Sequence, residues 1–235
     1  MQPELSIIVP VYNEERTLRT VMHSIVERCP TAQVIYVDDG SKDRSLAILR
    51  EEARPQDIVL TKQNGGKGSA IRMGLKHATG TFTAIQDADL EYDPGEILLL
   101  LKEAKEHPGS AAFGSRFLKK SPNIYKRFLL GNKLMTGWLN LLFGSKITDS
   151  YTCFKLIPTK DFQAFHLTGN GFELEAEICI QCILRSIPIR EIFITYRPRT
   201  IEEGKKISWR DAWLGFWTIL KLRVLSVAGG AGSRR

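Results

Sequence analysis

Short apolar runs and amphipathic segments alternate through about the first 115 residues of the chain. The runs are rich in β-branched and small apolar residues, which predicts buried strands at 5–11, 33–37, 57–61, 82–86 and 111–115. Between them lie helical segments such as 18–26, where apolar residues recur at helical spacing. Because this alternation is typical of parallel strands joined by crossover helices, we expect an α/β fold with a doubly wound, mostly parallel sheet.

The second half of the sequence is less regular. We expect two further strands, at 151–157 and 189–196. Helices are predicted at 124–144, 172–185 and 208–226. A length of 235 residues fits one large domain or a domain with an appendage.

Polar clusters follow three of the predicted strands, at 12–14, 38–43 and 87–91. Asn13, in the first cluster, is expected to cap the helix that follows. In doubly wound sheets, ligands bind beyond the carboxyl ends of the strands. We therefore expect the three clusters to converge on one crevice.

Asp87 and Asp89 are two residues apart at the end of a predicted strand, so their side chains point the same way if the chain stays extended. Two unpaired carboxylates would repel each other, and a divalent cation removes that conflict. Mg²⁺ favours one or two carboxylates together with substrate phosphates. Glu91 continues the spacing and could join the ligands. The alternative is a solvated acidic turn.

The other two clusters allow both a binding and a purely structural interpretation. Tyr12 can stack on a base or pack against a ribose, and Glu14 could accept a hydrogen bond from either. An ordinary capping turn would explain the same residues. Asp38 and Asp39 can accept from ribose or base donors, or can form an Asx turn that leads into a helix.

The glycine-rich segment 64–68 lacks the spacing of a P-loop. Its Lys67 is either an exposed residue at a helix entry or a contact to a nucleotide. The four histidines share no ligand spacing, and no Ser-His-Asp or Cys-His arrangement is visible. The four cysteines are expected to be reduced thiols, because the sequence shows no secretory signal. The CxxC pair Cys179 and Cys182 has no second ligand pair, which argues against a zinc or redox role.

Basic residues are concentrated in two parts of the chain, which carries a formal net charge of +7. Residues 116–148 contain seven Lys or Arg and no acid, and residues 199–235 contain eight against three acids. This distribution indicates a phosphate-rich ligand or an anionic membrane surface. No stretch reaches the roughly 18 apolar residues of a spanning helix, and the N-terminus lacks the basic region of a signal peptide.

Five motifs occur in order along the chain: PVYNEE (10–15), VDDGSKD (37–43), QNGGKGSAIRMGL (63–75), QDADLEYDP (86–94) and GSRF (114–117). Together they resemble family 2 glycosyltransferases with the GT-A fold, which is Rossmann-like. The later sequence RTIEEGKKISWRDAW (199–213) is similar to the subset related to dolichyl-phosphate mannose synthase and bacterial polyprenyl-phosphate glycosyltransferases. The resemblance covers about residues 5–222.

The resemblance implies an inverting transfer of a hexosyl group, with mannose or glucose expected, from a UDP- or GDP-linked sugar to a polyprenyl phosphate. The residues expected to hold the nucleotide are Pro10, Tyr12, Glu14, Asp38, Asp39, Lys67 and Asp87. Mg²⁺ or Mn²⁺ on the diphosphate is expected to bind Asp87, Asp89 and Glu91. Related synthases often carry Gln at the position of Glu91, so this chain has one more negative charge there.

On the acceptor side, the residues expected to bind phosphates are Arg116, Arg127, Arg199, Lys205 and Lys206, the last three from a mobile loop. Asp89, Arg116 and Arg127 are expected to carry catalysis. A lipid phosphate is already anionic, so its reaction needs charge compensation rather than a strong base. The glutamates of 173–177 could position the sugar or act as a base, or at least one could belong to an exposed helix face.

The expected organisation is one domain over 1–207, with a nucleotide-sugar half that ends near residue 115 and an acceptor half over 116–207. A membrane-surface helix (208–228) and a disordered tail (229–235) follow. Trp209, Trp213, Phe216 and Trp217 would anchor that helix, with Arg210, Lys221 and Arg223 facing anionic head groups. The alternative is a helix docked on the protein's own sheet. We expect a peripheral protein on the cytoplasmic face of the membrane.

Three other functions compete with this interpretation. A family 2 enzyme acting on a glycan or small hydroxyl acceptor would need a general base. A nucleotidyltransferase would need a glycine-rich loop with a catalytic cation near the N-terminus, which residues 10–16 lack. A non-enzymatic nucleotide-binding or membrane-bound adaptor would not need Asp87 and Asp89 together. No nucleic-acid partner is expected, and the sequence does not define an oligomeric state.

Overall fold

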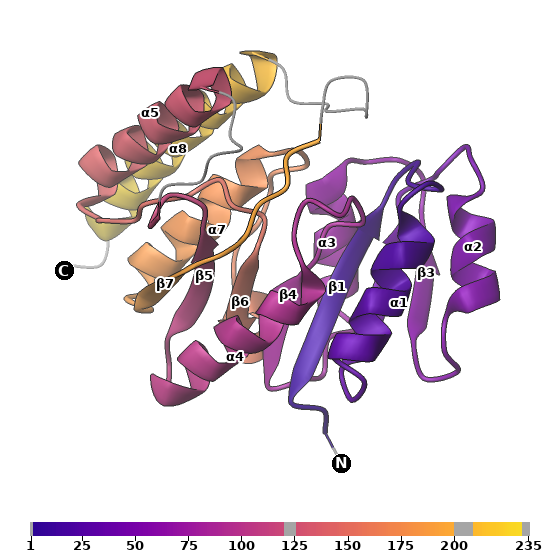
Figure 1. Cartoon of the computed structure of the whole chain (residues 1–235). Coiled ribbons are helices and arrows are strands. Elements are labelled where there is room, and N and C mark those ends of the chain that lie inside the picture. The colour runs from indigo at the N-terminus through magenta and orange to yellow at the C-terminus, as the bar shows by residue number, and fades with distance from the viewer. Residues whose placement is uncertain (1, 120–125, 200–208, 232–235) are drawn as a thin grey trace.

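The computed structural model describes residues 2–119, 126–199 and 209–231. Its centre is a sheet whose seven described strands are hydrogen-bonded in the order β3-β2-β1-β4-β6-β5-β7, with helices on both faces (Figure 1). The strands are β1 (Leu5–Val11), β2 (Gln33–Asp38), β3 (Ile58–Thr61), β4 (Phe82–Ile85), β5 (Ala111–Ser115), β6 (Lys155–Pro158) and β7 (Ile189–Phe193). Strand β6 runs antiparallel to β4 and β5, whereas the other pairs are parallel. The predicted doubly wound, mostly parallel sheet is confirmed.

The register of the central strands brings their carboxyl ends to one edge of the sheet. Val11 at the end of β1 lies beside Asp38 at the end of β2. Ile8, in the middle of β1, lies beside Ile85 at the end of β4. The residues that follow β4 are therefore level with the end of β1, so the polar clusters of all three strands meet at this edge.

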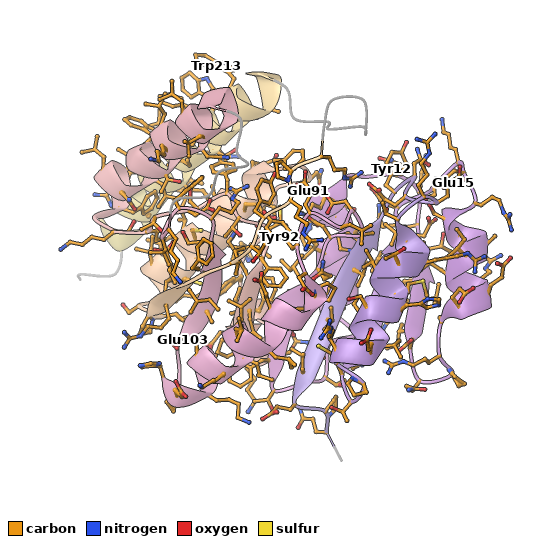
Figure 2. All side chains as sticks on the ribbon, viewed as in Figure 1. Tyr12, Glu15, Glu91, Tyr92, Glu103 and Trp213 are labelled. Atoms are coloured by element: carbon orange, nitrogen blue, oxygen red, sulfur yellow. The ribbon has the colours of Figure 1, made fainter. Side chains whose placement is uncertain are left out.

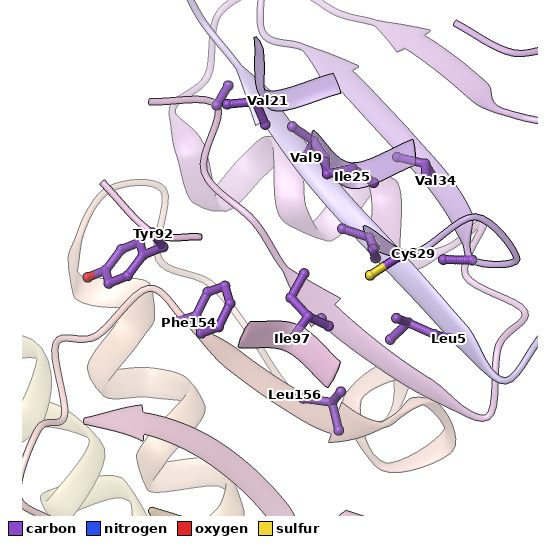
Figure 3. Packing of buried hydrophobic residues seen from close by; sticks show 14 of the residues in the cluster. Leu5, Val9, Val21, Ile25, Cys29, Val34, Tyr92, Ile97, Phe154 and Leu156 are labelled. Atoms are coloured by element: carbon purple, nitrogen blue, oxygen red, sulfur yellow. The ribbon is translucent and has the colours of Figure 1, made fainter. Parts of the chain in front are cut away.

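Helices cover the two faces of the sheet. They are α1 (Leu18–Arg28), α2 (Ser45–Glu52), α3 (Lys67–Leu75), the 3-10 turn η1 (Pro94–Glu96), α4 (Ile97–Glu106), α5 (Lys126–Phe143), α6 (Thr159–Gln163), α7 (Glu173–Leu184) and α8 (Trp209–Ala231). Side chains alternate along β1, so Ile7 and Val9 join the core under α1, α2 and α4, while Ile8 joins the core under α3 and α7. Figure 3 shows part of the first core, where Ile97 packs near Phe154.

Some predicted boundaries are wrong, and the polar contacts explain why. Helix α1 begins at Leu18, and Asn13 does not cap it: its backbone has a φ of 55°, and its side chain accepts a hydrogen bond from the backbone N–H of Lys42. Strand β7 ends at Phe193, and the segment after it reaches Glu91, which accepts a hydrogen bond from the Tyr196 hydroxyl. The short helix α6 was not predicted.

Helices α5, α7 and α8 pack together beside the sheet (Figure 1). The rings of Trp138 on α5 and Phe216 on α8 stack with centroids 4.7 Å apart. Gly215 lies so close to the Tyr151 hydroxyl that a Cβ atom would overlap it. Helix α8 therefore docks on α5 and α7, whereas the predicted alternative was docking on the sheet. Helix α8 also extends to Ala231, so residues 229–231 are helical rather than part of a disordered tail.

In the described parts of the chain, we find no helix whose length and apolar character would suffice to cross a bilayer.

Candidate functional site

The candidate site lies at the carboxyl ends of β1, β2 and β4, where Tyr12 and Glu91 lie at the same end of the sheet (Figure 2). The loops after β1 and β2 are tied to each other. The backbone N–H of Glu14 donates to Ser45 Oγ at 2.8 Å, and that of Glu15 donates to Asp43 at 3.1 Å. Burial alone would raise the pKa of Asp43, but the hydrogen bonds that its carboxylate accepts have the larger effect and lower this pKa below its usual value. These contacts hold Tyr12 and Glu14 at the edge of the site.

Asp38 and Asp39 are both buried, and they do different things. Asp38 accepts from the backbone N–H groups of Gly40 and Ser41 at 3.2 and 3.3 Å, which is the Asx turn that the sequence allowed. Asp39 accepts from Lys62 Nζ at 2.7 Å and from the backbone N–H of Gly66 at 2.8 Å. Asp39 therefore ties the glycine-rich loop before α3 to the end of β2.

Each carboxylate of the Asp87-x-Asp89 pair is held by a cationic side chain. Lys67 Nζ lies 2.7 Å from one oxygen of Asp87 and 2.9 Å from the other. Arg199 Nη2 lies 2.9 Å from Asp89 Oδ2. The two acidic side chains are only 15% and 16% exposed, so the alternative of a solvated acidic turn does not describe them.

Arg199 joins the loop after β1 to the loop after β4. Its guanidinium binds both oxygens of Glu14, at 3.0 and 3.1 Å, in addition to Asp89. The carboxylate of Glu91 accepts from the Tyr196 hydroxyl at 3.1 Å and from the backbone N–H of Arg199 at 2.9 Å. Glu91 therefore fixes the segment that carries Arg199, a role that the sequence did not suggest.

The donor set fits a divalent cation only in part. Asp87 and Asp89 provide hard oxygen ligands at a strand end, which suits Mg²⁺ or Mn²⁺ when phosphates complete the shell. No group of three or more His, Cys, Asp or Glu side chains in the described ranges is arranged to hold a metal ion. Glu91 in particular is directed at Tyr196 and Arg199. The fit therefore rests on the two aspartates and a ligand's own phosphates.

A chain of alternating charges leads from Asp87 into the core. Behind Lys67 lies Glu175 on α7, with Oε1 3.2 Å from Lys67 Nζ. The other oxygen of Glu175 lies 2.6 Å from Nζ of Lys155, which is fully buried. Burial would lower the pKa of Lys67, but Asp87 and Glu175 outweigh it and hold this pKa well above its usual range. Burial would raise the pKa of Glu175, but the two lysines lower it.

Sequence reasoning missed Lys155 entirely. The available signal was a lysine at the start of an otherwise apolar strand, KLIP, where a buried cation needs a carboxylate partner. For Glu175 the sequence suggested a sugar-positioning or basic role, or a place on an exposed helix face, but not a buried ion pair.

Arg116 is paired within the protein. Its Nε and Nη2 donate to the two oxygens of the buried Asp149 at 2.7 and 2.8 Å. Its guanidinium also lies 5.1 Å from the ring centre of Tyr196. Burial lowers the pKa of Arg116, but its partners reverse that effect and keep the pKa well above its usual range. Asp149 is a further residue that the sequence analysis missed.

Three other predicted cations lie wholly or partly beyond the described residues. Arg127 is in the first turn of α5, but its side chain falls outside the described part. Lys205 and Lys206 also lie outside it. Pro10 lies within β1 beside Val37 on β2, and it is half-buried next to the site.

The glutamates at 173, 175 and 177 do not form an exposed helix face. Glu177 is buried and accepts from the backbone N–H groups of Thr168 and Gly169 at 2.9 and 2.8 Å. Glu173 accepts from that of Asn170 at 2.8 Å. These two residues fix the loop that precedes α7, against which the glycines at the start of α3 pack.

Comparison with known proteins adds to this geometry. The family model described as "Glycosyl transferase family 2" matches residues 6–165. The low-salt glycan biosynthesis hexosyltransferase Agl6 of Haloferax volcanii is 26% identical over 219 residues, which make up 90% of this chain and 52% of that protein. The undecaprenyl-phosphate 4-deoxy-4-formamido-L-arabinose transferase of Edwardsiella ictaluri is 32% identical over 157 residues (63% of this chain, 47% of that protein).

A third relative is the dolichol-phosphate mannosyltransferase of Pyrococcus furiosus, which is 28% identical over 186 residues (76% of this chain, 53% of that protein). The chain spans about half the length of these three curated relatives.

Solved structures share the fold at low sequence identity. The mannosyl-3-phosphoglycerate synthase from Rubrobacter xylanophilus superposes with a TM-score of 0.74 at 17% identity, over 94% of this chain and 73% of that one. The glucosyl-3-phosphoglycerate synthase from Mycobacterium tuberculosis, solved with Mn²⁺, UDP and phosphoglyceric acid, gives 0.73 at 16% identity, over 94% and 78%. These likenesses confirm the predicted GT-A arrangement.

Proposed function

The chain belongs to glycosyl transferase family 2, and we propose that it transfers a hexosyl group, with inversion, from a nucleotide sugar to a polyprenyl phosphate. The observation that carries the proposal is the meeting of Glu14, Asp87, Asp89 and Arg199 at one edge of the sheet. The printed names of two relatives, an undecaprenyl-phosphate sugar transferase and a dolichol-phosphate mannosyltransferase, support the lipid acceptor.

On the donor side, the nucleotide lies across the ends of β1 and β2. Its base or ribose packs on Tyr12 beside Pro10, and its polar groups are held by Glu14, Asp38 and Asp39. Lys67 lies beside Asp87 and is close enough to add a contact to the diphosphate. Asp87 and Asp89 would hold Mg²⁺ or Mn²⁺ together with that diphosphate, and the cation would neutralise the negative charge of the leaving group.

On the acceptor side, cationic side chains bind the lipid phosphate near the sugar. Asp149 occupies Nε and Nη2 of Arg116, so a phosphate would meet the remaining amino group. Arg199 already lies at the site, and we propose the same role for Arg127, Lys205 and Lys206. Because the acceptor oxygen is anionic, these residues orient it and compensate charge, and no proton has to be removed.

The lipid tail and the membrane would meet the protein at α5 and α8. The two helices expose a series of large apolar side chains, to which we refer as the α5–α8 face: Leu130, Leu134, Leu141, Trp213, Leu214, Trp217, Val224 and Leu225. Lys221 and Arg223 are exposed on the same pair of helices and can meet anionic head groups. We propose peripheral attachment to the cytoplasmic face of the membrane through this face.

The experiment that tests the proposal is a product analysis. The protein is incubated with UDP- and GDP-linked mannose and glucose, and with polyprenyl phosphate, the free polyprenol or simple sugars as acceptors. We expect a polyprenyl-phosphate sugar and a nucleoside diphosphate to form only with the lipid phosphate. If the free alcohol or the sugars are used equally well, the acceptor is a hydroxyl group and the proposal is wrong.

A further inference from the structure

Four alternating charges run from the apolar core to the first aspartate of the Asp87-x-Asp89 pair. We infer that the two buried members, Lys155 and Glu175, are positioning residues, which hold Lys67 and through it keep Asp87 in place for the divalent cation. The inference rests on the proposed function, since it is there that Asp87 binds the cation.

The inner end of the chain is fully enclosed. Lys155 is on β6, and its Nζ lies 2.6 Å from Glu175 Oε2. The same ammonium donates to the backbone carbonyl oxygens of Ser150, at 3.3 Å, and Thr152. It also lies 5.4 Å from the ring centre of Phe113. These partners fix Lys155 in one position, and Lys155 in turn fixes one oxygen of Glu175.

The other oxygen of Glu175 faces the site. It lies 3.2 Å from Lys67 Nζ, and among the described residues it has no hydrogen bond of good geometry. Its hold on Lys67 is therefore mainly the attraction of opposite charges. The ammonium group of Lys67 lies between this carboxylate and that of Asp87, which it contacts at 2.7 Å. It therefore has a negative charge on two sides.

Stability alone does not explain this arrangement. Replacing a buried ion pair with apolar side chains of similar volume is often neutral or stabilising, because two desolvated charges are removed. A cation beside a metal-binding carboxylate also repels the incoming metal. The negative charge of Glu175 behind Lys67 offsets that repulsion. The chain thus lets one lysine orient Asp87 without excluding a divalent cation from it.

Two variants separate positioning from structural support. Glu175→Gln keeps the shape but leaves Lys67 and Lys155 without their shared carboxylate. The double variant Lys155→Met with Glu175→Leu replaces the whole buried pair with apolar groups. Each variant is titrated with Mn²⁺, in the absence and in the presence of UDP or GDP, and the EPR signal reports the free Mn²⁺. The melting temperature of each variant is also measured.

We expect the double variant to melt near the temperature of the unaltered protein, yet to bind Mn²⁺ about tenfold more weakly or worse, because the charge of Lys67 is no longer offset. Glu175→Gln should weaken Mn²⁺ binding similarly and also lower the melting temperature. Asp57→Asn is the matched control. It breaks another buried ion pair, with Arg54, just before the amino end of β3 and so at the opposite edge of the sheet from the site. It should lower the melting temperature and leave Mn²⁺ affinity unchanged.

The inference is overturned if the double variant binds Mn²⁺ like the unaltered protein, or if it fails to fold, since the pair would then be structural. If the proposed function itself is wrong, the experiment gives a different result. In that case the unaltered protein binds no Mn²⁺, or Asp89→Asn binds it equally well.

Discussion

At the scale of single residues, the site is organised by cations that already sit on its acids. Lys67 contacts Asp87, and Arg199 bridges Glu14 and Asp89. These pairs relieve the repulsion that clustered carboxylates would otherwise feel. A divalent cation bound to Oδ2 of Asp89 would compete with Arg199 for that oxygen, whereas the anchored Lys67 can keep its contact with Asp87.

Replacing Asp89 with Ala should lower the rate of sugar transfer by at least a hundredfold, as should Asp87→Ala. The physical reason is that each removes a carboxylate that would hold the cation on the leaving diphosphate. The rate is measured with the donor and lipid phosphate identified by product analysis, and the fold by circular dichroism. Excess chelator should have the same effect on the unaltered protein; full activity in chelator would contradict the proposal.

The thiols provide a prediction on pH dependence. All four cysteines are free and buried, and burial raises the pKa of Cys29 to about 11 and that of Cys179 to about 12. A raised pKa keeps the thiol protonated, and the thiolate is the reactive form. No cysteine of the native protein should react with a disulfide reagent between pH 7 and pH 9, and all four should react after unfolding in denaturant. A fast-reacting native thiol would contradict this burial.

At the scale of elements, the loops between strands and helices are fixed by backbone hydrogen bonds to acidic side chains. Asp39 holds the glycine-rich loop before α3, and Glu177 holds the loop before α7. The two loops touch: the backbone N–H of Gly68 donates to the carbonyl oxygen of Asn170 at 2.8 Å. Such contact requires residues without a side chain: a Cβ atom at Gly66 or Gly68 would overlap the backbone of 169–170, so these two glycines serve this close approach.

Gly68→Ala should therefore destabilise the protein by about 1–3 kcal/mol, as overpacked positions do. A Cβ atom at this position would overlap the carbonyl oxygen of Gly169, whose backbone is held by Glu177. The matched control is Gly131→Ala in α5, where a Cβ atom meets nothing within 4 Å. That change should stabilise the helix by roughly 0.5–1 kcal/mol. Urea denaturation measures both, and equal effects would contradict the close approach.

Local patterns were sufficient to predict most of the elements. The strand β1 has the predicted bounds, and α5 ends one residue before the predicted helix does. Local patterns could not predict contacts between residues that are distant in the sequence. Nothing near Arg116 identifies Asp149 as its partner, and nothing near Glu91 indicates the Tyr196 hydroxyl. Both contacts depend on how β5 and β7 are placed in the sheet, which sequence spacing does not encode.

At the scale of the whole molecule, the described structure has a polar edge and an apolar side. The acids and their cations lie at the carboxyl edge of the sheet. Helices α5 and α8 pack together beside the sheet (Figure 1), and the side chains of the α5–α8 face are exposed. Large exposed apolar patches on soluble proteins mark binding surfaces. The proposed reaction, between a water-soluble donor and a lipid acceptor, would use both surfaces.

Membrane attachment through that face is tested with vesicles. Trp213 and Trp217 are 58% and 51% exposed on α8, where their rings can enter the head-group region while Lys221 and Arg223 meet anionic lipids. Replacing both tryptophans with Ala should lower the partition coefficient for anionic vesicles at low salt about tenfold or more, since each aromatic side chain buries a large apolar area.

The matched control is Leu98→Ala with Leu99→Ala on α4: these leucines are 44% and 50% exposed but lie away from the α5–α8 face, so binding should not change. Raising the salt concentration should weaken binding of the unaltered protein, because the electrostatic part of the attraction is screened. If sedimentation leaves the unaltered protein entirely in the supernatant at low salt, α8 serves only to cover α5 and α7, and the membrane proposal fails.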